Sequence, residues 1–221
     1  MEAALELLKA EAAQGVRKVC LTPHLRHRMF ETPDEEIIQR FKQLSEEKKK
    51  AKIPVKLYLS REYHYDITLD KALESGTILP MARGVILTEF SYETPRAEML
   101  SAVERLTRKG LRPLIAHVER YREVQSDQGM ARELSCAGAL LQVNAGSILA
   151  EEGRRQKKVA EKMLLSNLVF AVASDAHNLE ERAPNLAECE AHISKYYGKE
   201  QARKLLYENP LKLLESKREE N

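Results

Sequence analysis

The chain has 221 residues, of which 43% are hydrophobic, so it can bury the core of about one domain and is not disordered throughout. Its 36 basic and 34 acidic residues leave a net charge of +2, which argues against a nucleic-acid partner. No apolar run approaches the roughly 18 residues of a membrane helix, which predicts no membrane insertion. The 3 cysteines are few and odd in number, so we expect a reducing compartment and a cytoplasmic protein.

Helical and extended segments alternate regularly along the chain. Residues 1–14 are rich in Ala, Leu and Glu, which predicts a helix, and residues 16–21 form a short run typical of a strand. A capping box, Thr32-Pro33-Asp34-Glu35, opens a predicted helix that ends at about Ala51. The remaining elements are strands over 55–60 and 84–88, a helix over about 96–109, strands over 113–116 and 139–143, a helix ending near Ser166, a strand over 168–172, and a helical tail from Asn185 interrupted by Asn209-Pro210.

This order of elements predicts an α/β fold with parallel strands and outer helices. Strands that alternate with helices pair in parallel through crossover connections, and nearly continuous apolar strands are covered on both faces. No glycine fingerprint of a dinucleotide-binding sheet is present, so a closed or distorted (β/α) barrel fits better. We expect a single domain over residues 1–221. A helix precedes the first recognisable strand, which indicates that an opening strand is missing.

Polar side chains follow almost every predicted strand. In parallel α/β barrels the catalytic residues lie just past the C-terminal ends of the strands. Imidazole and carboxylate groups are the ligands of divalent hydrolytic metal sites, which generate hydroxide and bind a transferring phosphoryl group. One histidine at a strand end is more often structural, but the repetition predicts a metal-dependent hydrolase. The residues at these positions are His24, Arg61-Glu62, Glu89, His117 with Glu119 and Arg120, Asn144, and Asp175 with His177.

Two arginines follow the last histidines of this series. Arg120 lies three residues beyond His117, and Arg182 lies five residues beyond His177. A guanidinium group binds phosphate oxygens in a bidentate manner, so both arginines are candidates to hold a phosphomonoester. The alternative is pairing with a carboxylate nearby in sequence, for which the candidates are Glu119 and Glu123 beside Arg120, and Glu180 and Glu181 beside Arg182.

The segment from Cys20 to Arg26 matches the C-x5-R spacing of thiolate phosphatases. That chemistry needs a loop of converging backbone N–H groups, which bind phosphate and lower the pKa of the thiol. The loop here has no glycine, Pro23 has no N–H, and Cys20 falls inside an apolar strand. The match is therefore interpreted as accidental.

Taken together, these motifs resemble those of the bacterial capsular-polysaccharide tyrosine phosphatases of the polymerase-and-histidinol-phosphatase (PHP) superfamily. The resemblance implies a distorted barrel with up to three metal ions, usually Mn²⁺, and hydrolysis of phosphotyrosine on proteins. The typical substrate is the autophosphorylated tyrosine kinase of exopolysaccharide export. The motifs are Thr22-Pro23-His24, Arg61-Glu62, Leu87-Thr88-Glu89-Phe90, Ala116-His117-Val118-Glu119-Arg120-Tyr121, Gln142-Val143-Asn144-Ala145-Gly146-Ser147 and Ser174-Asp175-Ala176-His177.

The resemblance also implies a role for each site residue. Glu62 and Asp175 serve one ion, and Glu62 bridges to a second ion. Glu89 and His117 complete that second site. The remaining residues are His24 and His177, which hold the third ion, and Arg120 and Arg182, which match the phosphate-binding arginines of the family.

The chain departs from the family pattern at its beginning, where no strand with a D-x-H-x-H motif is present. We therefore expect an N-terminally shortened enzyme in which the second metal site survives, the third is weakened and the first is compromised. Leu25 stands where a second histidine is frequent, and Arg61 stands where glycine is common. His27 and His64 are nearby candidates for substitute ligands. The alternatives are another PHP phosphomonoesterase, such as a histidinol-phosphate hydrolase, or a catalytically impaired regulatory relic.

Overall fold

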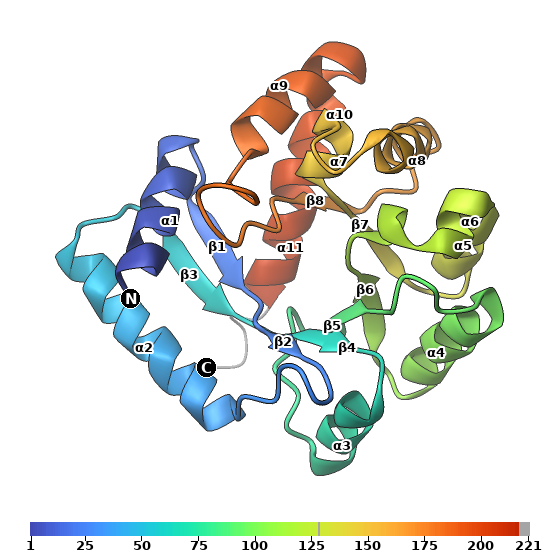
Figure 1. Ribbon diagram of the computed structural model, residues 1–221, viewed down its shortest axis with the longest axis horizontal. Coiled ribbons are helices and arrows are strands. Elements are labelled where there is room, and N and C mark those ends of the chain that lie inside the picture. The colour runs from blue at the N-terminus through green and yellow to red at the C-terminus, as the bar shows by residue number, and fades with distance from the viewer. Residues whose placement is uncertain (128, 217–221) are drawn as a thin grey trace.

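Parallel strands occupy the middle of the computed structural model, which describes residues 1–127 and 129–216, and helices surround them (Figure 1). The strands form a pair, β1-β3, and a larger sheet in the order β2-β4-β5-β6-β7-β8, with every pairing parallel. The predicted parallel α/β fold is confirmed. The strands are β1 (Lys18–Leu21), β2 (His24–Leu25), β3 (Lys56–Leu59), β4 (Glu62–His64), β5 (Val85–Glu89), β6 (Arg112–Ile115), β7 (Leu140–Asn144) and β8 (Ala171–Ala173).

Two of the predicted strands are each divided in two. β1 stops at Leu21 and resumes as β2 at His24, because Pro23 has no N–H to continue a ladder of hydrogen bonds. β3 likewise stops before Ser60 and resumes as β4 at Glu62. The first halves pair with each other, and the second halves join the larger sheet, where His24 lies opposite Glu62. The division places two polar side chains at the start of the short strands rather than past the end of the long ones.

The helices predicted over 1–14, 32–51, 96–109 and up to 166 are all present. The first turn of α2 differs from the prediction: Pro33 occupies the N-cap position and no side chain caps the helix, so the predicted capping box does not form. The described helices are α1 (Glu2–Ala13), α2 (Asp34–Lys50), α3 (Ile67–Ser75), α4 (Arg96–Arg108), η1 (Val118–Arg120), α5 (Arg122–Ser126), α6 (Gly129–Cys136), α7 (Ala145–Leu149), α8 (Arg154–Leu165), α9 (Leu186–Tyr196), α10 (Lys199–Arg203), η2 (Lys204–Glu208) and α11 (Asn209–Ser216).

The tail is helical, as predicted, but the predicted interruption at Asn209-Pro210 is wrong. The chain remains helical there, and α11 begins at Asn209, whose Nδ2 donates to the carbonyl of Phe170 at 2.7 Å. The break lies instead at Gly198, whose φ of +100° favours glycine. Residues 217–221, also predicted helical, lie outside the described residues. None of the described helices is both long and apolar enough to cross a membrane.

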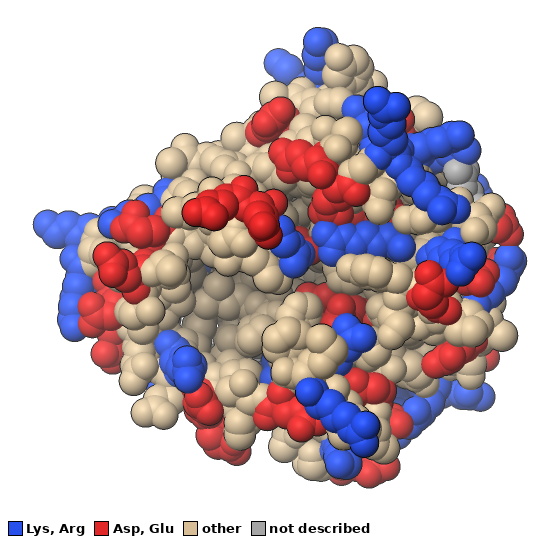
Figure 2. All heavy atoms as spheres, viewed as in Figure 1, with Lys and Arg blue, Asp and Glu red and all other residues tan. Residues whose placement is uncertain are grey.

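The ring of strands is open between β8 and β1, because no pairing joins these two strands within residues 1–127 and 129–216. Figure 1 shows α11 at this gap. Leu213 and Leu214 of α11 are buried with Tyr58 of β3 and Leu114 of β6, so the helix packs against both sheets. The fold is thus a distorted barrel whose gap is filled by the tail. Acidic and basic side chains are interspersed around a hollow on the face shown in Figure 2, in keeping with the small net charge.

Candidate metal centre and phosphate site

The first group of predicted site residues meets at neighbouring strands of the larger sheet. His24 begins β2, Glu62 begins β4 and Glu89 ends β5, and these three strands are adjacent in the sheet. Each of the three side chains offers a ligand atom, and these atoms lie within 4.8 Å of one another. Nδ1 of His24 is 3.2 Å from Oε1 of Glu89. The sheet therefore assembles one imidazole and two carboxylates into a compact set of metal-ligand atoms.

His117 joins this set from β6. Its Nε2 is 2.9 Å from Oε1 of Glu62 and 3.7 Å from Oε2 of Glu89. The residue follows β6 closely and has a φ of +36°, in the left-handed region that is strained for a side chain of this size. The backbone thus turns at the strand end while the imidazole stays against the two carboxylates.

The charges of these residues are strongly coupled. The adjacent Glu89 carboxylate raises the pKa of His24 above its ordinary value of 6.5. Burial lowers the pKa of His117, but the neighbouring Glu62 carboxylate outweighs burial, so the pKa is raised. Burial raises the pKa of Glu89, but His24 and His117 outweigh it, so the pKa is lowered and this carboxylate stays ionised. The two carboxylates thus favour positive charge at this buried position, and a metal ion can supply that charge in place of the protons on the imidazoles.

The donors fit a divalent metal ion. Nδ1 of His24 is buried without a hydrogen-bond partner among the described residues, although a carboxylate oxygen lies close to it. Buried polar atoms are normally paired, so an orphaned imidazole nitrogen beside carboxylates needs an explanation. Nitrogen and oxygen donors without sulfur suit Mn²⁺, Zn²⁺ or Fe.

The second group is centred on Asp175, which follows β8 and is largely buried. Its Oδ2 accepts a hydrogen bond from Nδ2 of Asn144 at 2.8 Å, lies 3.4 Å from Nη1 of Arg120 and is bonded by Nη2 of Arg182. Burial raises the pKa of Asp175, but the charges of Arg182 and His117 and the other partners outweigh it, so the pKa is lowered. One carboxylate thus holds both predicted phosphate-binding arginines.

Neither arginine pairs with the carboxylates that are its sequence neighbours. Nε of Arg120 donates to Oε2 of Glu152 at 2.8 Å, and Arg182 pairs with Asp175. The alternative pairings considered for Arg120, with Glu119 or Glu123, are therefore wrong. Glu119 is directed into the interior and accepts a hydrogen bond from the backbone N–H of Asn144 at 3.1 Å.

His177 connects the two groups. Its Nδ1 lies 2.8 Å from the backbone oxygen of Asp175, and its Nε2 lies 3.1 Å from Nη1 of Arg182. The ring centroid is 6.1 Å from that of His24. All the predicted metal ligands and both arginines therefore form one continuous cluster, although the three-atom set itself contains only His24, Glu62 and Glu89.

Sequence reasoning missed Glu152, the partner of Arg120. This residue follows α7 by three positions, in a turn that no strand-end rule identifies. The side chain of Asn144, which the sequence placed at a strand end, donates to both Glu152 and Asp175, at 3.1 and 2.8 Å. Neither proposed substitute ligand belongs to the three-atom set. His27 pairs with Glu31 at 2.7 Å. His64 lies opposite Glu89 in the pairing of β4 with β5, and its Nδ1 faces Asp66 at 3.2 Å.

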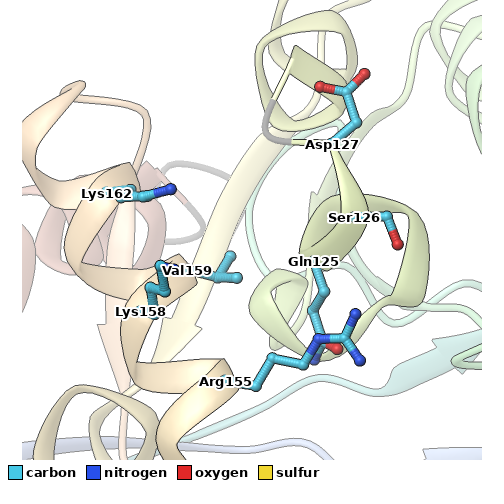
Figure 3. Close-up of a pocket in the computed structure, with 7 residues that line it drawn as sticks. All are labelled: Gln125, Ser126, Asp127, Arg155, Lys158, Val159 and Lys162. Atoms are coloured by element: carbon cyan, nitrogen blue, oxygen red, sulfur yellow. The ribbon is translucent and has the colours of Figure 1, made fainter.

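A separate cavity of about 460 Å³ lies between α5 and α8 (Figure 3). It contains none of the predicted site residues. Its lining residues are Gln125, Ser126, Asp127, Arg155, Lys158, Val159 and Lys162.

Comparison with known proteins agrees with the geometry. Tyrosine-protein phosphatase CpsB of Streptococcus agalactiae is 32% identical over 222 residues, covering 98% of this chain and 91% of that protein. Tyrosine-protein phosphatase YwqE of Bacillus subtilis is 29% identical over 199 residues, covering 89% and 78%. A solved structure, from work on YwqE of Bacillus subtilis and CpsB of Streptococcus pneumoniae as metal-dependent tyrosine phosphatases, superposes with a TM-score of 0.87 at 27% identity, covering 98% of this chain and 87% of that one.

The model of one protein family, described as capsular polysaccharide synthesis, CpsB/CapC, matches residues 1–215. This match spans all the described strands and every residue of the cluster. The motifs on which the sequence resemblance rested are the segments that the fold brings together. The chain belongs to the CpsB/CapC family of capsular polysaccharide synthesis proteins.

Proposed function

We propose that the chain is a metal-dependent protein-tyrosine phosphatase that hydrolyses phosphotyrosine on proteins. The observation that carries the proposal is the convergence of His24, Glu62 and Glu89 within 4.8 Å of one another, in contact with a cluster that contains Arg120. Relatives that span nearly the whole chain bear the name tyrosine-protein phosphatase. A cation-binding acidic pocket beside a guanidinium group suits an anionic phosphomonoester.

His24, Glu62, Glu89 and His117 would hold metal ions, and Asp175 and His177 would complete the ligand set. Bound divalent ions supply a deprotonated water at neutral pH and neutralise negative charge on the phosphoryl group. We propose Mn²⁺ as the ion, in up to three positions.

The arginines would bind the phosphate oxygens. Glu152 and Asp175 fix the guanidinium of Arg120 from two directions, so little side-chain entropy is lost when phosphate binds. Arg182 is more exposed and bonds both Asp175 and His177, so it can exchange these partners for a phosphate oxygen. Together they would orient the ester and balance the charge that develops on it.

The proposed substrate is an autophosphorylated bacterial tyrosine kinase that controls capsule or exopolysaccharide synthesis, with both proteins meeting in the cytoplasm. The family description, capsular polysaccharide synthesis, supports this choice.

The test measures release of phosphate from a phosphotyrosine peptide by the purified chain, with Mn²⁺ and with a chelator. We expect turnover only with Mn²⁺, and a loss of about 100-fold or more in Glu89→Gln and Arg120→Ala. Lys158→Ala, a change of a cavity residue outside the cluster, is the matched control and retains full activity. Faster turnover of histidinol phosphate than of phosphotyrosine would overturn the substrate, and Mn²⁺ binding without turnover of either would overturn the enzymatic activity.

A further inference from the structure

Two exposed aromatic side chains stand beside the metal-ligand cluster. Phe30 is 47% exposed, and its ring stacks on the imidazole of His24 with a centroid distance of 5.2 Å and an interplanar angle of 25°. Tyr92 is 51% exposed, and its ring meets that of His117 edge-on at 6.3 Å. Neither ring was identified from the sequence as part of the site.

Each ring contacts a different histidine of the cluster. The carboxylate of Glu89 stands between the two histidines, with one oxygen 3.2 Å from His24 and the other 3.7 Å from His117. Phe30 and Tyr92 therefore stand next to the two histidines that this carboxylate joins. Single exposed apolar residues are common on proteins, but two that stand beside one polar site form a feature that needs an explanation.

Backbone hydrogen bonds fix the two loop segments that carry these rings. Phe30 and Arg26 exchange two backbone hydrogen bonds of 2.9 Å, which closes the loop after β2. The carbonyl of Tyr92 accepts a hydrogen bond from the N–H of Arg122 at 2.9 Å. The hydroxyl of Tyr92 is 3.5 Å from Nη1 of Arg120, the proposed phosphate-binding group. An ester held by Arg120 would therefore have an aromatic side chain directly beside it.

We propose that Phe30 and Tyr92 bind the phenyl ring of the phosphotyrosine and thereby select aryl over alkyl phosphomonoesters. The inference rests on the proposed function. It adds the protein side chains that would distinguish phosphotyrosine from phosphoserine. Aromatic rings attract each other in offset or edge-to-face arrangements, which corresponds to about two- to tenfold in affinity for each pair beyond the effect of buried area. Phosphoserine has no ring to make these contacts.

The test compares two peptides of one sequence, with phosphotyrosine or phosphoserine, under saturating Mn²⁺. We expect the ratio of kcat/KM for phosphotyrosine over phosphoserine to fall about threefold in Phe30→Ala and in Tyr92→Ala, mainly through KM. Tyr92→Phe keeps the ring and therefore keeps the ratio. Tyr207→Ala removes an exposed ring of the tail helices, 57% exposed, and is the matched control. An equal loss for both peptides would overturn the inference, because the rings would then support the cluster rather than the substrate.

A binding measurement separates this inference from the proposed activity. Phenylphosphonate and methylphosphonate are not hydrolysed, and calorimetry gives their affinities for the Mn²⁺-loaded protein. We expect the wild type to prefer phenylphosphonate about tenfold and the double variant Phe30→Ala/Tyr92→Ala to lose that preference while its Mn²⁺ affinity is unchanged. An unchanged preference overturns the inference even if phosphotyrosine is hydrolysed. Failure of phosphotyrosine turnover overturns the proposed function. The preference for phenylphosphonate can still be measured in that case, because binding does not require turnover.

Discussion

Ser147 lies between two carboxylates that cannot both accept its proton. Its Oγ is 2.6 Å from Oε1 of Glu119 and 2.9 Å from Oε2 of Glu152. A hydroxyl carries one hydrogen, so it can donate fully to only one of the two carboxyl groups. Burial raises the pKa of Glu119, whereas Arg120 outweighs burial and lowers the pKa of Glu152. Glu119 therefore binds a proton more readily than Glu152, which is the anion that holds Arg120.

This assignment predicts how Glu119→Gln changes the pH dependence of stability. The pKa of Glu119 lies above its ordinary value of 4.5 in the folded state, so the folded chain binds more protons and loses stability as the pH rises above that value. The glutamine side chain of the variant cannot titrate. We therefore expect urea unfolding of the metal-free variant to show a smaller loss of free energy between about pH 5 and pH 8 than the wild type. Equal slopes for the two proteins would show that Glu119 is ionised when folded.

The guanidinium of Arg61 ties the segment that follows β2 to the sheet. Nη2 donates to the carbonyl of His24 at 2.8 Å. Nη1 donates to the carbonyl of Thr32 at 2.9 Å and to Oδ1 of Asp34 at 2.5 Å. The side chain is almost fully buried, so Asp34 supplies the charge that compensates it. Asp34, which lies inside the predicted capping box, therefore serves this ion pair.

Removal of Asp34 should destabilise the protein because the charge of Arg61 remains buried without its counterion. We expect Asp34→Ala to lower the free energy of unfolding by about 3 kcal/mol, measured by urea titration. Glu35→Ala removes an exposed carboxylate from the same helical turn and should cost under about 1 kcal/mol. The double variant Asp34→Ala/Arg61→Met should recover part of the loss, since no buried charge is left uncompensated. A loss equal to that of Glu35→Ala would contradict a structural ion pair.

At the scale of elements, the sequence predicted the helices and strands that are long enough to show a hydrophobic period, and the polar residues at the ends of those strands. Apolar runs predicted the long strands and the main helices. The polar residues after those runs predicted the residues of the cluster. The short strands β2 and β4 contain too few residues to show a period, so the divisions at Pro23 and Ser60 were not predicted. Glu152, Phe30 and Tyr92 lie in loops and turns, where tertiary contacts and not local pattern decide the position of a side chain.

The helix α3 was also missed, although its boundary residues carry clear signals. Asp66 is the N-cap, where its carboxylate accepts the N–H of Thr68 at 2.7 Å, and Gly76 ends the helix with a φ of +69°. The carboxylate also accepts the N–H of His27 at 3.0 Å, so it connects α3 to the loop that carries Phe30. Short helices of this kind depend more on their caps than on propensity.

The stability that the Asp66 cap contributes should depend on pH. Burial raises the pKa of Asp66, but its hydrogen bonds from Thr68 and His27 outweigh burial, so the pKa lies below its ordinary value of 3.8. The carboxylate therefore stabilises the fold above that value, and this stabilisation is lost as the pH falls through the lowered pKa. We expect Asp66→Ala to cost about 1 kcal/mol at neutral pH by urea titration, and Asp66→Asn to cost less because asparagine also caps helices. Equal losses in the two variants would argue against capping.

At the scale of the whole molecule, the cluster joins parts of the chain that the sheet alone leaves open. His24 belongs to β2 at one edge of the larger sheet, and Asp175 and His177 follow β8 at the other edge. Glu11 of α1 accepts a hydrogen bond from Ser174 at 3.0 Å, so α1 also contacts the loop that carries Asp175. A metal ion bound by ligands from both edges would connect them across the gap. Such an ion binds only the folded arrangement and therefore stabilises it.

Addition of Mn²⁺ should therefore raise the Tm of the metal-free protein, and a chelator should reverse the change. A free Mn²⁺ concentration of about 100 times Kd corresponds to about 2.7 kcal/mol of stabilisation. The pKa of His24 is raised above 6.5 by Glu89, and an ion competes with that proton, so the Mn²⁺-dependent rise should shrink as the pH falls below the raised value. Glu89→Gln should abolish most of the rise, and Lys158→Ala should retain it. A rise that is the same in Glu89→Gln and in the wild type would place the ion elsewhere on the molecule.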